Sequence, residues 1–283
     1  MDKKAVTSME RQRSCTRTIS LMNMLSSSIG AKSVNNFAKL FDEAFSRFEG
    51  EEGLKGVDTE SSRFWYPFFY GERPITDKQL DRLLCMDDQV KTLFSEGPSK
   101  LWVAMWGDVS ELIAIIRDYN KSLSHMPLHF ITKQVSRAIR DIDKGNRMLV
   151  DFVWSISFYR LINEVQPEAL VDVENYPATQ ASCAWNLIDM CMNDDLVESE
   201  LDALGIRIQV IDELSKHELE RMRRMPVQRR LADVSLVPGF YTDFSVEEAE
   251  RCGAFFEDAL SYEDAIDSAH EDESFDETMA FSC

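Results

Sequence analysis

The chain has 283 residues, of which 44% are hydrophobic and 10% aromatic, so a wholly disordered protein is excluded. Fifty acidic and 31 basic side chains give a net charge of −19, which opposes non-specific binding of the whole molecule to nucleic acid. No apolar run approaches the roughly 18 residues that span a bilayer, and the polar start lacks a signal-peptide core, so we expect a cytoplasmic protein without membrane contact.

The first elements are a polar segment, a helix and an acidic loop. Residues 1–32 are polar and basic, and we expect a flexible arm with a short helix around residues 19–25. Apolar side chains recur at helical spacing over residues 34–48, behind Ser33 as the N-cap, which predicts an amphipathic helix. Residues 49–62 hold three glycines and five acids, which indicates an exposed loop.

The densest aromatic cluster of the chain lies in residues 63–70, just before a Gly71–Pro74 turn. Pro67 allows a helix there only if it stands in the first turn. Thr76 and Gln79 then form a capping-box pattern, which predicts the start of a further helix.

Helical patterns continue through the rest of the chain. Asp108 and Glu111 predict a capped helix, and residues 148–165 are apolar on nearly all sides, as in a central buried helix. Residues 206–210 alternate, which leaves open a short strand or the start of a long helix that Pro226 ends. The sum of these patterns predicts an all-α fold.

Composition divides the chain into four parts. We expect a basic flexible arm (1–32), an N-terminal helical domain (33–124), a C-terminal helical domain (130–242), and an acidic helix with a disordered tail (243–283). The last part carries fourteen acids and one arginine, and therefore most of the excess negative charge. The intervening stretch, His125–His129, is the expected linker.

Residues 34–84 resemble the later part of the helix-turn-helix module of bacterial and phage repressor-like regulators. The positions that carry the resemblance are Trp65, Gly71, Arg73, Pro74, Leu80 and Leu83. Pro67, inside the would-be recognition helix, and the acidic loop 49–60 depart from the module. These departures leave open a degenerate module that no longer reads DNA. If the module binds DNA, the resemblance implies that five side chains touch phosphates or bases: Arg63, Tyr66, Tyr70, Arg73 and Lys78. The alternative is an aromatic cluster that only packs a helical core.

Two further basic clusters are candidate nucleic-acid contacts. One lines a single face of a helix predicted over residues 130–147, with spacings of four, three, four and three: Lys133, Arg137, Arg140, Lys144 and Arg147. The other has six basic and two acidic side chains in residues 216–230, among them Arg223 and Arg224. Such clusters bind phosphate backbones, but they could also dock the acidic tail or form solvated faces.

The acidic end is a candidate partner-binding segment. Four aromatic side chains are interleaved there with Asp and Glu: Phe255, Phe256, Tyr262 and Phe275. Acidic segments with aromatic side chains often order on contact with a partner. Nucleic-acid mimicry and simple solubilisation are the alternatives.

The sequence contains no familiar catalytic, phosphate-binding or dinucleotide-binding motif. Pro127 separates His125 from His129, so we expect no metal site and no cofactor. We predict a non-enzymatic, DNA-associated regulatory or accessory protein of bacterial or mobile-element type. The alternative is an acidic helical module that inhibits or scaffolds a nucleic-acid-handling complex. An unfamiliar enzyme is a third option, and homo-oligomerisation stays open.

Overall fold

The computed structural model describes residues 7–49, 58–123, 147–165, 180–225, 227, 230, 231, 234 and 244–251. These residues form helices, turns and loops without a strand, so the predicted all-α class is confirmed. The chain divides into two compact units, Met1–Tyr241 and Thr242–Cys283. None of the described helices is both long enough and apolar enough to cross a membrane.

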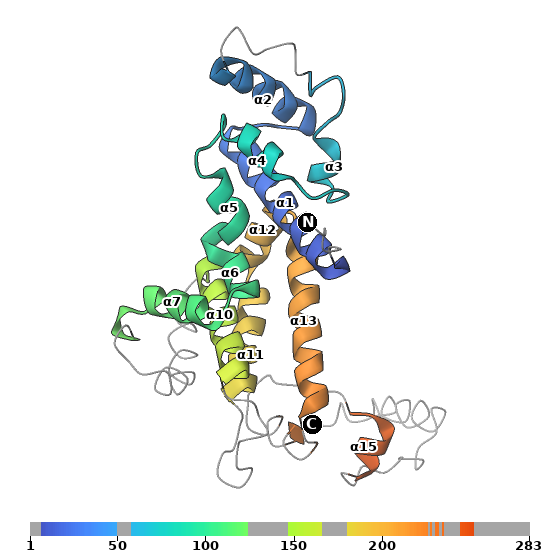
Figure 1. Cartoon of the computed structure of the whole chain (residues 1–283). Coiled ribbons are helices and arrows are strands. Elements are labelled where there is room, and N and C mark those ends of the chain that lie inside the picture. Colours follow the sequence, from blue (N-terminus) through green and yellow to red (C-terminus); the bar gives the residue numbers. More distant parts are fainter. Residues whose placement is uncertain are drawn as a thin grey trace, which may run out of the picture. The chain divides into compact units, whose positions relative to one another are not determined.

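Figure 1 labels the helices along the chain. Those of the first unit are α1 (Ser8–Ser28), α2 (Val34–Glu49), α3 (Tyr66–Phe69), α4 (Asp77–Leu83), α5 (Val90–Glu96), η1 (Pro98–Lys100), α6 (Leu101–Trp106), α7 (Val109–Tyr119), η2 (Lys121–Leu123), α10 (Leu149–Val165), α11 (Gln180–Met192), α12 (Asp195–Ala203) and α13 (Arg207–Arg224). The second unit contains α15 (Val246–Arg251).

Residues 8–28 form the 21-residue helix α1, so the prediction of a flexible arm over residues 1–32 is wrong for this part of it. A capping box starts the helix, because Glu10 N donates to Thr7 Oγ1 at 3.1 Å and Thr7 N donates to the Glu10 carboxylate at 2.9 Å. Thr16 and Thr18 are buried, and their hydroxyls donate to backbone carbonyls one turn earlier. These internal hydrogen bonds let a polar sequence form a core helix.

Helix α1 contributes to two hydrophobic cores. Leu21, Met22 and Leu25 pack with side chains of α2 to α5. Ile19 belongs to the larger core, which is built from α6, α7 and α10 to α13. Helix α1 packs against both α3 and α5, and it thereby supports the helices of the first half of the chain.

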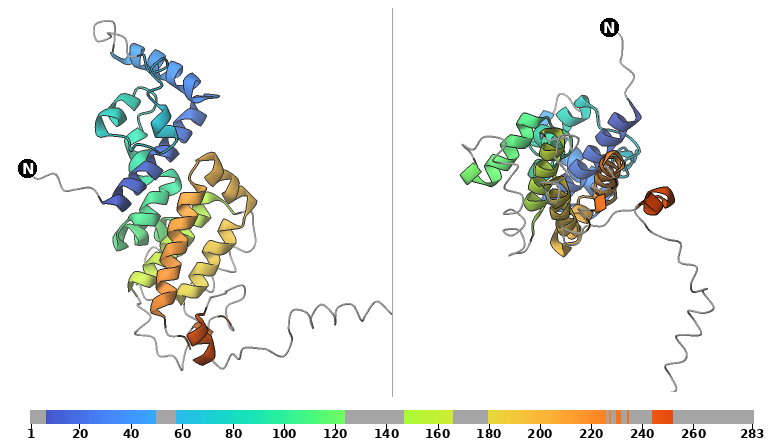
Figure 2. Two further views of the ribbon diagram at one scale, coloured as in Figure 1. Left: turned by 90° about the vertical axis from the view of Figure 1, so that its right-hand side faces the viewer. Right: turned by 90° about the horizontal axis from the view of Figure 1, so that it is seen from below.

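Helix α10 is the central helix of the larger core, as its all-round apolar pattern predicted. It packs against α6, α7, α11 and α12, and Figure 2 shows it running beside α11 and α13. Phe152, Ile156 and Phe158 are wholly buried. Burial of each such side chain contributes about 1.5–3 kcal/mol relative to exposure.

The predicted helix starts are confirmed where short-range hydrogen bonds define them. Thr76 and Gln79 form the capping box of α4, and Asp108 caps α7. Pro67 stands in the first turn of α3, the one place where the sequence allowed a proline within a helix there. Residues 207–224 are helical, so the helical alternative for that stretch is the right one. The linker expected at residues 125–129 lies outside the described residues, and so does the basic helix predicted over residues 130–147, except for Arg147.

Candidate nucleic-acid interface

Three of the predicted nucleic-acid contacts lie together at α3. The guanidinium carbon of Arg63 lies 6.0 Å from the centroid of the Tyr66 ring. The rings of Tyr66 and Tyr70 are 6.1 Å apart, with 34° between their planes. Arg63 is exposed, Tyr66 is half-buried, and Tyr70 is 68% exposed. We name Arg63, Tyr66 and Tyr70 the α3 surface.

An aromatic core supports the α3 surface from the inside. Trp65 is buried, and its ring packs edge-on against Phe41 with a centroid distance of 4.8 Å. Trp65 Nε1 donates to Thr59 Oγ1 at 3.1 Å, and that hydroxyl donates to Asp42 Oδ1 at 2.7 Å. Packing and hydrogen bonds to α2 therefore hold the backbone that carries the α3 surface.

The outer side chains are positioned as well. Tyr66 Oη donates to Asn35 Oδ1 at 3.1 Å, which ties the ring to α2. Arg63 has a φ of 52°, in the left-handed region that costs free energy for a side chain larger than glycine. The exposed Lys39 lies one turn beyond Asn35 on the same face of α2.

Helix α1 supports the chain directly after the α3 surface. Gly71 has a φ of 69°, and a Cβ atom there would lie 2.6 Å from Ile19 Cδ1. Ile75 N donates to the buried hydroxyl of Thr18 at 3.0 Å. The turn between α3 and α4 thus favours glycine through its positive φ, and it fits closely against α1.

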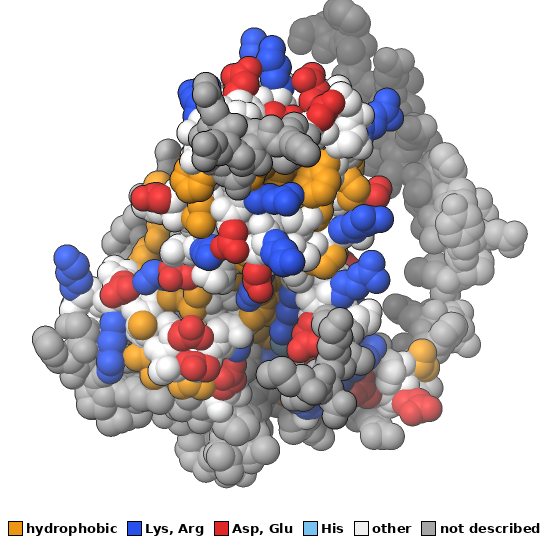
Figure 3. Space-filling model, turned by 45° about the horizontal axis from the view of Figure 1, so that its top comes forward, with side chains coloured by type: hydrophobic (Ala, Val, Ile, Leu, Met, Phe, Trp, Pro, Cys, Tyr) orange, Lys and Arg blue, Asp and Glu red, His pale blue; other side chains and the backbone are white. Residues whose placement is uncertain are grey.

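Arg73 and Lys78 are exposed on the α3–α4 connection and on α4. Within the described residues, no hydrogen bond or ring contact joins them to the α3 surface. Exposed carboxylates accompany them along the chain, among them Glu60, Glu72 and Asp77. Figure 3 shows basic and acidic side chains interspersed on the face it displays, so positive charge does not dominate this face.

The described residues between 34 and 84 do not form the predicted helix-turn-helix-like arrangement. Helix α3, in the place of the recognition helix, spans four residues. Trp65, one of the positions that carried the resemblance, is 1% exposed and lies in the core. A recognition helix presents several side chains along one exposed face to the major groove, and α3 is too short for that.

Of the second predicted cluster, only Arg147 lies within the described residues; Lys133, Arg137, Arg140 and Lys144 lie outside them. Arg147 Nη1 pairs with Asp194 Oδ2 at 3.5 Å, and the two side chains are 19% and 17% exposed. The fold itself therefore compensates the charge of Arg147.

The basic residues of α13 divide between surface and core. Arg224 pairs with Glu220 at 3.8 Å on the exposed side, and Arg223 is exposed. Arg221 is almost wholly buried with Glu218. The cluster predicted from the sequence is therefore not one continuous basic surface along this helix.

The buried pair on α13 joins three helices. Arg221 Nε and Nη2 donate to the Glu218 carboxylate at 2.7 and 2.6 Å, and Nη2 also donates to Ser182 Oγ at 3.1 Å. Tyr159 Oη donates to Glu218 Oε2 at 2.6 Å. Burial and the negative charge of Glu218 raise the pKa of Tyr159, so the phenol stays a neutral donor.

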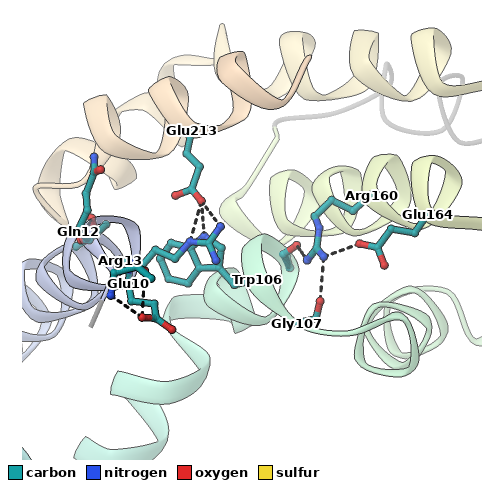
Figure 4. Close-up of polar contacts among 11 residues, drawn as sticks. Glu10, Gln12, Arg13, Trp106, Gly107, Arg160, Glu164 and Glu213 are labelled. Carbon is teal, nitrogen blue, oxygen red and sulfur yellow. Dashed lines mark hydrogen bonds and ion pairs between the residues drawn. The ribbon is translucent and has the colours of Figure 1, made fainter. Parts of the chain in front are cut away.

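A second polar cluster, which the sequence analysis missed, joins α1, α6 and α13 (Figure 4). Glu213 Oε1 accepts hydrogen bonds from Trp106 Nε1 at 2.8 Å and from Arg13 Nε and Nη2 at 3.0 and 2.8 Å. The guanidinium carbons of Arg13 and Arg17 lie 5.3 and 4.9 Å from the Trp106 ring centroid. Since 200 positions separate Arg13 from Glu213, no local pattern signals this cluster.

A groove of about 420 Å³ opens beside the polar cluster around Glu213. It lies between α1 and α13, and its lining includes Ser8, Met9, Gln12, Lys216, His217 and Glu220. The lining carries charges of both signs. In the part of the chain that the structure describes, no three His, Cys, Asp or Glu side chains are grouped to hold a metal ion.

The second unit is described only over residues 244–251. Ser245 N donates to the Glu248 carboxylate at 3.0 Å and Glu248 N donates to Ser245 Oγ at 3.2 Å, so the predicted cap of α15 is confirmed. The predicted partner-binding side chains lie outside the described residues: Phe255, Phe256, Tyr262 and Phe275.

Comparison with known families places the detectable similarity near the carboxyl end. Residues 215–274 match a family model described as "Conjugal transfer, TraD, beta/gamma-type". No solved structure matches the chain. The match links this segment to conjugal transfer, a process of mobile elements. The predicted resemblance to repressor-like helix-turn-helix regulators is wrong, because the family match is of another kind and α3 is no recognition helix.

The matched segment begins inside α13, and Glu218 and Arg221 belong to it. Both side chains are paired in the core with partners on α10 and α11. The first part of the matched segment is therefore built into the first unit.

Proposed function

We propose that the protein is a non-enzymatic accessory protein of a conjugal transfer system that contacts nucleic acid through the α3 surface. The family match over residues 215–274 supports a role in conjugal transfer. The arrangement of Arg63, Tyr66 and Tyr70 supports the nucleic-acid contact, because a guanidinium and two aromatic rings lie in series on an exposed, well-supported site. Such groups bind bases by stacking and cation–π attraction.

Three arginines of the other predicted or observed polar clusters are already paired, whereas Arg63 is not. Arg13, Arg147 and Arg221 each pair with a carboxylate inside the fold. Within the described residues, Arg63 forms no ion pair, and its guanidinium makes a cation–π contact with the Tyr66 ring. Its charge is therefore available to a ligand.

A direct test is the binding of labelled DNA by the full chain at about 50 and about 200 mM salt. We expect retention at the lower concentration and weaker retention at the higher one, because phosphate contacts release counterions. The absence of retention at low salt, also after deletion of residues 243–283, would reject nucleic-acid contact.

A second candidate function is a protein-interaction module of the same transfer system. The observation in its favour is the pairing of basic side chains one by one with acids, as for Arg207 with Glu198 and Asp202. Co-purification from the host with and without nuclease separates the two functions. A partner that remains after nuclease treatment supports the module, and a partner lost with the nucleic acid supports the α3 surface.

A further inference from the structure

We infer that the α3 surface binds the unstacked bases of single-stranded nucleic acid and does not read the grooves of a duplex. The inference rests on the proposed function, since it names the class of nucleic acid that the same surface takes. Four features of this surface favour single strands: the length of α3, the geometry of its rings, their support and the charge around them.

The length of α3 excludes groove reading. Four helical residues rise by about 6 Å, at 1.5 Å per residue. The neighbouring Trp65 and Phe68 are 1% and 4% exposed, so neither side chain can reach a groove. The helix itself presents the half-buried ring of Tyr66 and ends at the exposed ring of Tyr70, whereas groove readers rely mainly on slender polar side chains that reach base edges.

The ring geometry suits bases that have left the helical stack. Tyr70 is 68% exposed. The half-buried Tyr66 ring has a neighbour at each of two distances, the Tyr70 ring at 6.1 Å and the Arg63 guanidinium at 6.0 Å. An unstacked base has two free aromatic faces, and stacking of one base on an aromatic side chain contributes about 1–3 kcal/mol.

The support beneath the rings lowers the entropic cost of binding. The hydrogen bond from Tyr66 to Asn35 and that from Trp65 to Thr59 hold the segment before a ligand arrives. A side chain that is already immobilised avoids an ordering cost of roughly 0.5–1.5 kcal/mol on binding. The strained φ of 52° at Arg63 is also consistent with a position held for function.

The charge around the α3 surface favours binding of single strands over binding of duplex DNA. Arg63, Arg73 and Lys78 are accompanied by the exposed carboxylates of Glu60 and Glu72. A surface with so little excess positive charge neutralises few phosphates, and duplex binding depends strongly on phosphate contacts. Stacking of a base on an aromatic ring adds a favourable contribution that phosphate neutralisation does not supply.

The test is fluorescence anisotropy of the full chain with three labelled probes: a mixed-sequence DNA single strand, its duplex, and the RNA single strand. We expect the DNA single strand to bind at least about tenfold more tightly than the duplex. Tyr70→Ala should weaken single-strand binding by about tenfold. Tyr70→Phe keeps the ring and should stay within about twofold of the wild type.

Phe48→Ala is the matched control, because Phe48 is an exposed aromatic side chain at 66% on α2. It lies thirteen residues beyond Asn35, or about 20 Å along the helix axis, and its substitution should leave binding unchanged. Far-ultraviolet circular dichroism and the thermal midpoint of each variant show whether the fold is intact.

The outcomes distinguish the inference from the proposed function. Equal binding of duplex and single strand, or an unchanged affinity of Tyr70→Ala, overturns the inference and leaves nucleic-acid contact standing. The absence of binding to all three probes rejects nucleic-acid contact itself. Similar affinities for the two single strands support the inference, because both present unstacked bases.

Discussion

Glu218 and Arg221 form an ion pair three residues apart on α13, with 2.6 Å between Arg221 Nη2 and Glu218 Oε1. Their side chains are 10% and 8% exposed, and Tyr159 donates to the same carboxylate. A pair of this kind fixes how three helices meet, because each charge depends on its partner for compensation.

Removal of one member of this pair is expected to be severe. Glu218→Ala removes the buried carboxylate that Arg221 and Tyr159 share, and we expect the free energy of unfolding to fall by about 3–5 kcal/mol. Urea denaturation followed by circular dichroism measures this loss. The double variant Glu218→Leu with Arg221→Leu should lose clearly less, because no buried charge remains. Equal losses for the single and double variants would contradict the prediction.

The turn after α3 offers a test with a close control. Gly71→Ala introduces a left-handed alanine and a Cβ at 2.6 Å from Ile19 Cδ1. Gly30→Ala has the same φ of 69°, but nothing lies within 4 Å of its Cβ. We expect Gly30→Ala to cost about 1 kcal/mol from backbone strain and Gly71→Ala about 2–3 kcal/mol. Thermal and urea unfolding give the comparison, and equal costs would show that the contact with α1 relaxes freely.

The sequence predicted best those elements that depend on contacts between residues close in the chain. The capping boxes at Thr76 and Ser245 involve side chains three residues apart, and α4 and α15 begin where those patterns indicate. The all-round apolar run of residues 148–165 likewise predicted the central helix.

The sequence did not predict features that depend on distant partners. The buried hydroxyl of Thr18 accepts a hydrogen bond from Ile75, which is 57 residues away. Because this partner is so distant in the sequence, the polar start of the chain indicated a free arm. The aromatic cluster of residues 63–70 divides in a way that composition alone does not show. Trp65 is directed into the core and Tyr70 outward, because the short helix and the Gly71 turn set their directions.

The polar cluster around Glu213 gives a third prediction. Trp106→Phe keeps the ring under the arginines and removes the hydrogen bond to the carboxylate, and we expect a loss of about 1–2 kcal/mol. Glu213→Ala removes the carboxylate that accepts all three hydrogen bonds, and the free energy of unfolding should fall by about 2–3 kcal/mol. Lys216→Ala, at 66% exposure on the same helix, should stay within about 0.5 kcal/mol. Guanidinium denaturation with tryptophan fluorescence measures the first two, and a cost for Lys216→Ala equal to theirs would refute a specific role for Glu213.

The pH dependence of stability should report the burial of Cys191. Burial raises the pKa of its thiol from 9.0 to about 11, in spite of the Ser155 hydroxyl at 3.8 Å. The folded state therefore holds the thiol proton more strongly than the unfolded state does. This stabilisation is complete below about pH 9 and is lost as the pH rises towards 11.

The difference in unfolding free energy between the wild type and Cys191→Ala isolates this contribution, because other titrating groups are common to both proteins. We expect that difference to shift by about 1 kcal/mol against the wild type between pH 8 and pH 10. Urea titrations at several pH values measure it. A difference that stays constant over this range would mean that the thiol ionises as readily in the folded chain as in the unfolded one, and that water reaches Cys191 in the core.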